Sequence, residues 1–202
     1  VMIGYSDSNK DSGIASARWA LQEAQIALVK TAATHKFDLF LFHGRGGTIS
    51  RGGGKTNAAV MGSPPGTING YLRVTEQGEI INEKYGLRGI ALRTLEQATS
   101  SVALASAAPQ YQKTDMPEWQ TLMQLIAEKS QKKYQHLSHH SPGFNDYFRQ
   151  ATPIDLIEKM RIGSRPSSRS QDNSIDSLRA IPWVFAWTQN RYIIPGWYGF
   201  GS

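Results

Sequence analysis

Two short apolar runs separated by one amphipathic stretch constrain the fold of this chain more than any other feature. Val1–Tyr5 predicts a buried strand, and Asp38–Phe42 predicts a second one. Between them, from Ile14 to about Thr34, apolar residues recur on one face of a helix. A strand–helix–strand unit joins parallel neighbours and places the loops that follow the strands on the same side of the sheet. The pattern therefore predicts an α/β fold.

A glycine-rich segment follows the second of these strands directly. Phe42–Lys55 reads FHGRGGTISRGGGK and carries two arginines and a lysine. Glycine lets backbone N–H groups converge on an anion, and arginine adds bidentate charge. Such a loop at a strand end predicts a site for a phosphorylated or carboxylated small molecule, because α/β sheets hold ligands there. The alternative is a flexible surface hairpin with two solvated arginines.

The same segment does not match a nucleotide-binding loop. Gly54-Lys55-Thr56 resembles the end of the phosphate-loop pattern, but Ile49 stands where that pattern needs its first glycine. A strand–glycine–helix pattern for dinucleotides, with an acidic residue downstream, is also missing from the sequence. We therefore do not expect a nucleotide site here.

Composition sets the remaining limits. The chain has 202 residues, 40% of them hydrophobic, and a formal net charge of +6, which favours anionic ligands. It lacks cysteine, so disulfides and thiolate sites are excluded and a cytoplasmic location is expected. The apolar runs are too short to cross a membrane, and no basic block predicts nucleic-acid binding. Both ends lie in unfinished patterns, so we expect a piece of a longer protein.

Further elements are expected along the rest of the chain. The segment SDSNKDSG after the first strand predicts a polar turn, and Tyr71–Thr75 predicts a strand. Ile90–Ala108 predicts a long, mostly buried helix, and Ala180–Trp187 fits a strand or a helix equally well. Residues 164–177 are polar and without an apolar period, which predicts a mobile loop. Other helices are expected near Asn57–Met61, Glu79–Tyr85, Phe144–Gln150 and Pro153–Met160, and from Pro117 onward.

Several charged residues are candidates for chemistry. Asp7 and Lys10 follow the first strand, where a carboxylate can bind Mg²⁺ and a lysine can face an anionic oxygen. A capping turn with solvated charges explains the same spacing equally well. Arginines at 161, 165, 169 and 179 bracket the polar loop, which is then able to close over an anionic substrate, unless these charges are simply solvated.

The histidines carry weaker signals. His43 opens the glycine-rich loop, but a lone histidine beside glycine is more often a structural hydrogen-bonding group than an acid or base. His136, His139 and His140 have no acidic partner at metal-ligand spacing, so we interpret them as surface residues.

Four segments together resemble the phosphoenolpyruvate carboxylase family. VMIGYSDSNKDSG at Val1–Gly13 resembles the family's signature around its catalytic lysine, and FHGRGGTISRGGG resembles its glycine-rich arginine loop. Pro64–Tyr85 and Ser177–Gly199 match further blocks of the family. The resemblance runs in order over 1–202, loosely in Ala103–Gln150, so we treat these residues as one segment of a single catalytic domain.

The resemblance implies a fold, a reaction and an assembly. The fold would be a partial (β/α)₈ barrel of the TIM type, helix-rich and with several inserted helices. The reaction joins phosphoenolpyruvate and bicarbonate into oxaloacetate and inorganic phosphate, through carboxyphosphate and an enolate, with Mg²⁺ or Mn²⁺. The full-length parent would be a cytoplasmic homotetramer that binds neither nucleic acid nor membrane, and the 202 residues alone would be inactive.

The resemblance also implies roles for individual residues. Asp7 resembles a metal ligand and Lys10 the catalytic lysine. Arg45 and Arg179 resemble arginines that grip the substrate, and Arg165 a catalytic arginine at the base of the mobile loop. The remaining implied residues are His43, Gly46 and Gly47 beside the substrate, and Arg51 toward bicarbonate or the inhibitor aspartate.

Two alternatives remain open from the residues alone. One is another enolate-forming barrel lyase that acts on a phosphorylated substrate without bicarbonate. The other is an anion-binding module without turnover, although its cationic residues are spread over strand-end loops rather than gathered on one face with aromatic residues. The resemblance assigns no role to Arg169, because SSRSQDNSID departs from the more basic, glycine-containing loop of the family.

Overall fold

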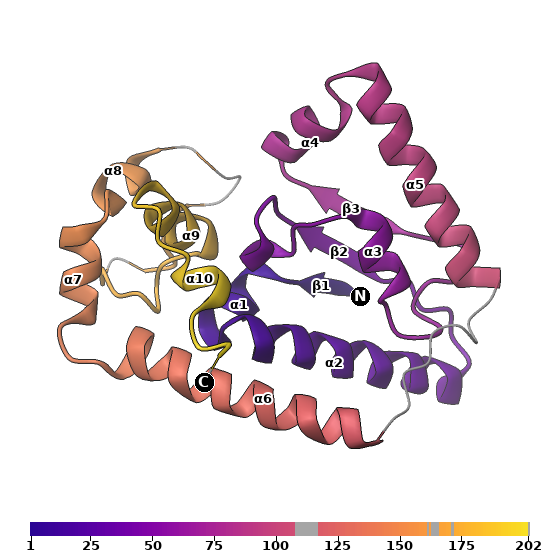
Figure 1. The fold of residues 1–202 in the computed structure, drawn as a ribbon, viewed down its shortest axis with the longest axis horizontal. Helices are drawn as coiled ribbons and strands as arrows, with labels where there is room; N and C mark the ends of the chain where they lie inside the picture. Colours follow the sequence, from indigo (N-terminus) through magenta and orange to yellow (C-terminus); the bar gives the residue numbers. More distant parts are fainter. Residues whose placement is uncertain (108–116, 161, 163–165, 171, 202) are drawn as a thin grey trace. The chain divides into compact units, whose positions relative to one another are not determined.

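The protein is an α/β chain rich in helices, seen here in a computed structural model (Figure 1). The structure describes residues 1–107, 117–160, 162, 166–170 and 172–201. It divides into two compact units, Val1–Tyr5 with Trp19–Leu122 and Ser6–Arg18 with Met123–Ser202. We describe each unit by itself.

The first unit contains a parallel sheet of three strands, in the order β1-β2-β3. β1 (Met2–Gly4) pairs with β2 (Phe42–Arg45), and β2 pairs with β3 (Arg73–Glu76). In the register, Ile3 lies opposite His43, which lies opposite Val74. The parallel strands joined through helices confirm the α/β class that the sequence predicts.

Helices cover one face of this sheet. Leu21 and Leu28 of α2 (Ile14–His35) pack against Ile3, Tyr5 and Leu41. α3 (Thr56–Met61) packs against α5 (Arg88–Ala107) through a second small apolar cluster, and α4 (Gly78–Tyr85) also contacts α5. The opposite face, with Met2, Gly4, Arg73 and Thr75, is exposed. The strands therefore alternate between a covered and an open side.

The second unit is built from helices around aromatic residues. Its elements are α1 (Ser6–Ser12), the start of α2, most of α6 (Pro117–Gln135), a π-helical turn η3 (His136–His140), α7 (Phe144–Ala151), α8 (Ile154–Lys159), α9 (Ala180–Gln189) and α10 (Ile194–Trp197). Trp183 and Trp187 are fully buried and meet edge to face, with ring centroids 5.6 Å apart. Phe148 stacks obliquely on Trp183 at 5.0 Å. This cluster is the core of the unit.

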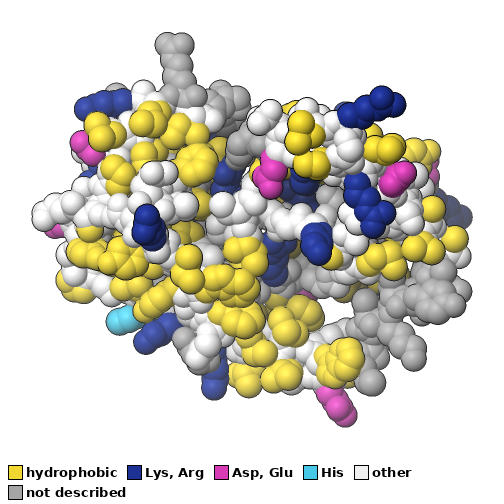
Figure 2. Space-filling view, turned by 45° about the horizontal axis from the view of Figure 1, so that its top comes forward, with side chains coloured by type: hydrophobic (Ala, Val, Ile, Leu, Met, Phe, Trp, Pro, Cys, Tyr) yellow, Lys and Arg dark blue, Asp and Glu magenta, His cyan; other side chains and the backbone are white. Residues whose placement is uncertain are grey.

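Several local predictions need correction. The segment after β1 is the helix α1 rather than a turn, and the strand expected at Asp38–Phe42 lies later, at Phe42–Arg45. The ambiguous segment after Arg179 is the helix α9. The long helix α5 exists, but only Ser101 and Ala105 are buried among its described residues, so the expected burial is wrong. Exposed apolar side chains occur on the surface elsewhere too, as one face shows in yellow (Figure 2).

Candidate functional site

The residues that the sequence singles out divide between the two units. In the first unit, β2 carries His43 and Arg45, and the loop that follows it carries Gly46, Gly47 and Arg51. Asp7, Lys10 and Arg179 belong to the second unit. Arg165 lies outside the described residues.

His43 is a buried, neutral hydrogen-bonding group. It is 4% exposed, and its Nδ1 lies 2.9 Å from the Tyr5 hydroxyl. Burial, and secondarily the charge of Arg45, lowers the pKa of His43 from 6.5 to about 4. The imidazole is therefore uncharged near neutral pH. This geometry agrees with the structural interpretation of His43 that the sequence favours.

Arg45 lies next to this pair. Its guanidinium carbon is 5.2 Å from the centroid of the Tyr5 ring, which is within range of a cation–π contact. The side chain is half-buried, so part of it stays accessible to solvent. Arg45 is thus held over an aromatic ring at the end of a strand.

The glycines of the loop serve its own compact turn. The N–H groups of Gly46, Gly52 and Gly53 donate to backbone carbonyls of the same loop, with N···O distances of 2.7, 3.3 and 2.7 Å. A Cβ at Gly46 would lie 2.7 Å from Arg51, and Arg51 is only 1% exposed. These three N–H groups are therefore not directed at an anion, so they take no part in the anion site that the sequence predicts for this loop.

A cavity of about 330 Å³ adjoins the outer part of the loop. Gly46, Gly47, Gly54 and Lys55 line it from the loop, and Lys84 lines it from α4. Gly54 faces open space, because a Cβ there would meet nothing within 4 Å, although its φ of 127° favours glycine. The loop thus borders an open, polar hollow within the first unit.

In the second unit, α1 buries a cation. Lys10 is 1% exposed, and its Nζ lies 3.3 Å from Oδ1 of Asp11 and 3.5 Å from the backbone oxygen of Asp176. α1 packs against α9, and the Asn9 amide donates to the backbone oxygen of Pro195 at 2.6 Å. A buried ammonium is costly unless it is paired, so this lysine occupies a defined place rather than a solvated turn.

Arg179 is the residue before α9, and it follows Asp176, which accepts from Lys10, by three positions. Its backbone N–H donates to Ser167 at 2.9 Å, and Ser168 pairs with Leu178 in an antiparallel bridge. The Nε atom of Arg179 is buried and has no hydrogen-bond partner among the residues that the structure describes. The guanidinium therefore has donor capacity that the described protein groups leave unused.

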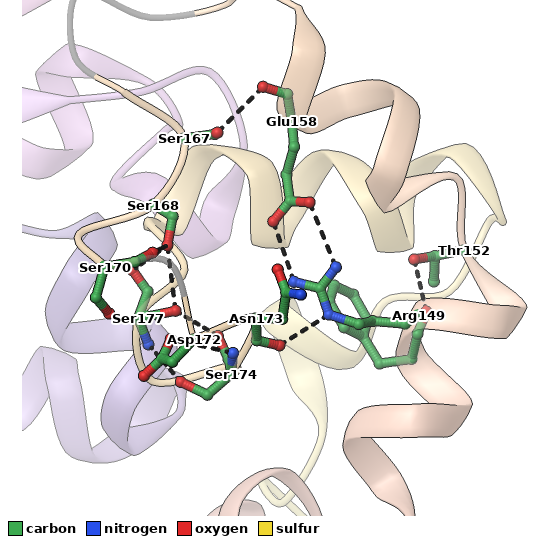
Figure 3. A network of polar contacts seen from close by, with 11 residues as sticks. Arg149, Thr152, Glu158, Ser167, Ser168, Ser170, Asp172, Asn173, Ser174 and Ser177 are labelled. Atoms are coloured by element: carbon green, nitrogen blue, oxygen red, sulfur yellow. Dashed lines mark hydrogen bonds and ion pairs between the residues drawn. The ribbon is translucent and has the colours of Figure 1, made fainter.

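The polar loop before Arg179 is held by a hydrogen-bond network (Figure 3). Arg149 binds both carboxylate oxygens of Glu158, at 3.3 and 3.1 Å, and donates to the backbone oxygen of Asn173 at 2.8 Å. Ser168 Oγ reaches Ser177 at 3.1 Å. Hydrogen bonds thus connect the described part of the loop to α7 and α8. The mobility expected for residues 164–177 stays a prediction.

Asp7 is the residue that the resemblance implies as a metal ligand, and its carboxylate lies beside an arginine. Its Oδ1 lies 3.3 Å from the guanidinium of Arg169, and both side chains are about half exposed. No group of three or more acidic or histidine side chains suited to a metal ion occurs among the described residues. One carboxylate paired with an arginine does not make a divalent-cation site, so these residues alone do not fit the metal.

The sequence does not predict the contact between His139 and Asp176, the residue whose backbone oxygen accepts from Lys10. His139 Nε2 lies 3.3 Å from Oδ1 of Asp176, and the imidazole is 17% exposed. The two residues are far apart in sequence, and no local pattern links them. His139 is therefore partly buried against a carboxylate, and its interpretation as a surface residue is wrong; that it does not belong to a metal site stays a prediction.

Comparison with known proteins decides the family. The family model for phosphoenolpyruvate carboxylase matches residues 1–202. The chain belongs to the phosphoenolpyruvate carboxylase family. Nothing in the described residues contradicts this, and no helix among them is long and apolar enough to cross a membrane.

Curated members of the phosphoenolpyruvate carboxylase family are similar over the whole chain. A phosphoenolpyruvate carboxylase of Xanthomonas oryzae pv. oryzae is 55% identical over 203 residues, and one of Corynebacterium glutamicum is 49% identical over 202. Phosphoenolpyruvate carboxylase 2 of Chlamydomonas reinhardtii is 47% identical over 203 residues. All of this chain is covered in each case, but it spans only 22%, 22% and 16% of those proteins.

Proposed function

We propose that the protein to which these residues belong carboxylates phosphoenolpyruvate with bicarbonate, forming oxaloacetate and inorganic phosphate. The observation that carries the proposal is the match of the family model from residue 1 to residue 202. Relatives with 55% identity over the chain bear the name of this activity. The alternatives, another enolate-forming lyase or a binding module without turnover, lack comparable support.

The proposed chemistry needs cations around a phosphorylated substrate. A bicarbonate oxygen attacks phosphorus, and the bond from phosphorus to the enol oxygen breaks. Carboxyphosphate and the enolate of pyruvate result; carboxyphosphate then releases CO₂ and phosphate, and C3 of the enolate attacks CO₂. Phosphoryl transfer depends mostly on positioning and charge neutralisation, which suits lysine and arginine.

We assign Lys10 and Arg179 to this chemistry within the second unit. The buried ammonium of Lys10 stabilises negative charge as it develops on the substrate, because a desolvated cation interacts more strongly than a hydrated one. The unused buried donor of Arg179 is available to a phosphate oxygen. Arg165 joins them by family resemblance.

The first unit supplies the other proposed contacts. Arg45 binds the substrate phosphate, with His43, Gly46 and Gly47 beside it, and Arg51 serves the bicarbonate or inhibitor region. The neutral state of His43 keeps the charge of this region on the arginines. The family also implies a divalent cation, Mg²⁺ or Mn²⁺, with Asp7 as one ligand. Because the described residues do not fit it alone, no step is derived through it.

The remaining features of the proposal concern the whole protein. We propose a (β/α)₈ barrel to which β1, β2 and β3 contribute, and the open face of this parallel sheet supports that idea. We also propose a cytoplasmic homotetramer with a mobile loop near 164–177, and no activity for the 202 residues alone.

A chimera tests the proposal. The matching segment of the Xanthomonas oryzae relative is replaced by this chain, and oxaloacetate is measured with malate dehydrogenase and NADH. We expect bicarbonate-dependent turnover, a loss of about 10²–10³-fold in Lys10→Met, and little change in Lys30→Met, an exposed lysine of α2. A folded chimera that consumes phosphoenolpyruvate without bicarbonate would favour the other lyase; binding without turnover would favour the anion-binding module.

A further inference from the structure

The buried Lys10 depends on a backbone carbonyl of the polar loop. Its three ammonium hydrogens require acceptors, and the described ones are the carboxylate of Asp11 and the backbone oxygen of Asp176. Asp11 is 57% exposed, so water screens much of its charge. The position of the Asp176 carbonyl therefore matters for where the ammonium lies.

That carbonyl is fixed from two sides. The segment Ser174–Leu178 forms a turn in which Ser177 N–H donates to Ser174 Oγ at 3.1 Å (Figure 3). In the same turn, Leu178 N–H donates to the backbone oxygen of Ile175 at 3.2 Å. The carboxylate of Asp176 meets Nε2 of His139 at 3.3 Å. Since 76% of the Asp176 side chain is exposed, His139 is its main described anchor.

His139 is itself held rigidly. Its Nδ1 lies 2.6 Å from Oγ of Ser138, which is 4% exposed and donates to the backbone oxygen of Tyr134 at 2.9 Å. Just before η3, Gln135 donates to the backbone oxygen of Asp11 at 3.1 Å. The same helical segment thus contacts both residues that accept from Lys10.

We propose that His139 is a positioning residue for Lys10: by binding the carboxylate of Asp176 it fixes the carbonyl that accepts from the ammonium. The inference rests on the proposed function, because Lys10 is the lysine assigned to the chemistry. It also extends to Arg179, since the turn at Asp176 leads directly into the start of α9.

The contact between His139 and Asp176 survives a change of protonation. Burial lowers the pKa of His139; Asp176 and Asp11 raise it, and Lys10 and His140 lower it. Above that pKa the neutral ring still donates from Nε2 to Asp176. Nδ1 then accepts from the Ser138 hydroxyl, which no longer donates to the backbone oxygen of Tyr134. Below it an ion pair forms. The positioning effect should therefore be strongest in acid and persist, weaker, near neutral pH.

The test uses the chimera described above and two readouts. One is the rate at which acetic anhydride modifies Lys10, followed for each lysine by mass spectrometry. The other is the separation of kcat from KM. We expect His139→Leu to raise the modification rate of Lys10 and to lower kcat, each by about tenfold, with KM changed little, because a hydrogen bond to a charged group is lost.

Matched variants separate positioning from general damage. His139→Gln keeps a donor near the place of Nε2 and should restore most of both readouts. Asp176→Ala should match His139→Leu, and the double variant should be no worse than either single one. His136→Leu, at an exposed position of η3, should behave as the parent.

The outcomes decide the two proposals separately. Unchanged modification of Lys10 in His139→Leu, additive effects in the double variant, or a Gln variant no better than Leu would each overturn the positioning role. If His139→Leu exposes buried residues generally, the Gln variant and Asp176→Ala still decide the matter. A chimera that makes no oxaloacetate would refute the proposed function, while the modification rates would still test the role of His139.

Discussion

Acidification should disturb the loop after β2 through His43. The imidazole is buried against the Tyr5 hydroxyl and near the guanidinium of Arg45. Protonation would place a second cation beside Arg45 at a buried position, where water cannot screen the repulsion between the two charges. It would also force Nδ1 to donate, so that the Tyr5 hydroxyl could only accept in this contact.

The loss of folding stability in acid follows from the lowered pKa of His43. A pKa lowered from 6.5 to about 4 favours the neutral folded form by about 3 kcal/mol, at about 1.4 kcal/mol per unit. Because the folded pKa is depressed, this stabilisation is complete above about pH 6.5 and is lost as the pH falls through about 4. At about pH 5, roughly 2 kcal/mol should already be lost, according to the same linkage relation.

Hydrogen–deuterium exchange at the imidazole C2 position, read by mass spectrometry, measures the pKa of one histidine in a large protein. In the chimera we expect a midpoint for His43 at about pH 4, against about 6.5 for a short histidine peptide. Arg45→Met should raise the midpoint only part of the way, since burial is the larger cause.

Two results would refute this reasoning. A midpoint for His43 equal to that of the peptide would mean that the ring is charged or solvated in the folded protein. Complete recovery of the ordinary value in Arg45→Met would mean that the neighbouring charge, and not burial, controls the pKa of His43.

Four further substitutions test packing and one ion pair. Gly53→Ala would put a Cβ 2.3 Å from a backbone carbonyl of the same loop and should lower the free energy of unfolding by about 1–3 kcal/mol. Gly89→Ala, which has open space in α5, should instead raise it by about 0.5–1 kcal/mol. Urea unfolding measures both. Trp183→Ala, at a fully buried site, should cost about 3–5 kcal/mol in the same assay; a smaller loss would show that this cluster is not the core. Arg149→Ala should destabilise by about 1 kcal/mol through its partly exposed pair with Glu158, and a double-mutant cycle without coupling would contradict the network.

The regular elements of the first unit could be predicted from the sequence. The apolar stripe from Ile14 onward predicts α2 to within a residue or two, and short runs predict β1 and β3 with small errors in their ends. These signals are local: a periodic pattern and its breakers. Helix α5 shows the limit, because an apolar composition does not say which of its faces has a neighbour.

The helix α1 could not be predicted in the same way. SDSNKDS contains residues that favour turns and caps, and it lacks an apolar stripe. Tertiary contacts override this preference, because α1 packs against α9 and buries Asn9 and Lys10. A buried lysine is rare, so a polar segment gives no warning of it.

Resemblance to the family indicates the candidate site residues more strongly than their spacing in the sequence does. Lys10 and Arg179 are far apart in sequence, and only the fold places both in the second unit. The contact between His139 and Asp176 has no signature in the sequence, because it joins a helix end to a distant loop. Long-range partners of this kind require the structure.

Transfer of labelled oxygen tests the central claim most directly. In the proposed reaction one oxygen of bicarbonate bonds to phosphorus, and the other two leave with CO₂. With ¹⁸O-labelled bicarbonate, the chimera should release phosphate that carries one labelled oxygen, in step with oxaloacetate, and Lys10→Met should slow both products together. Phosphate without the label, or phosphate released without oxaloacetate, would contradict the account.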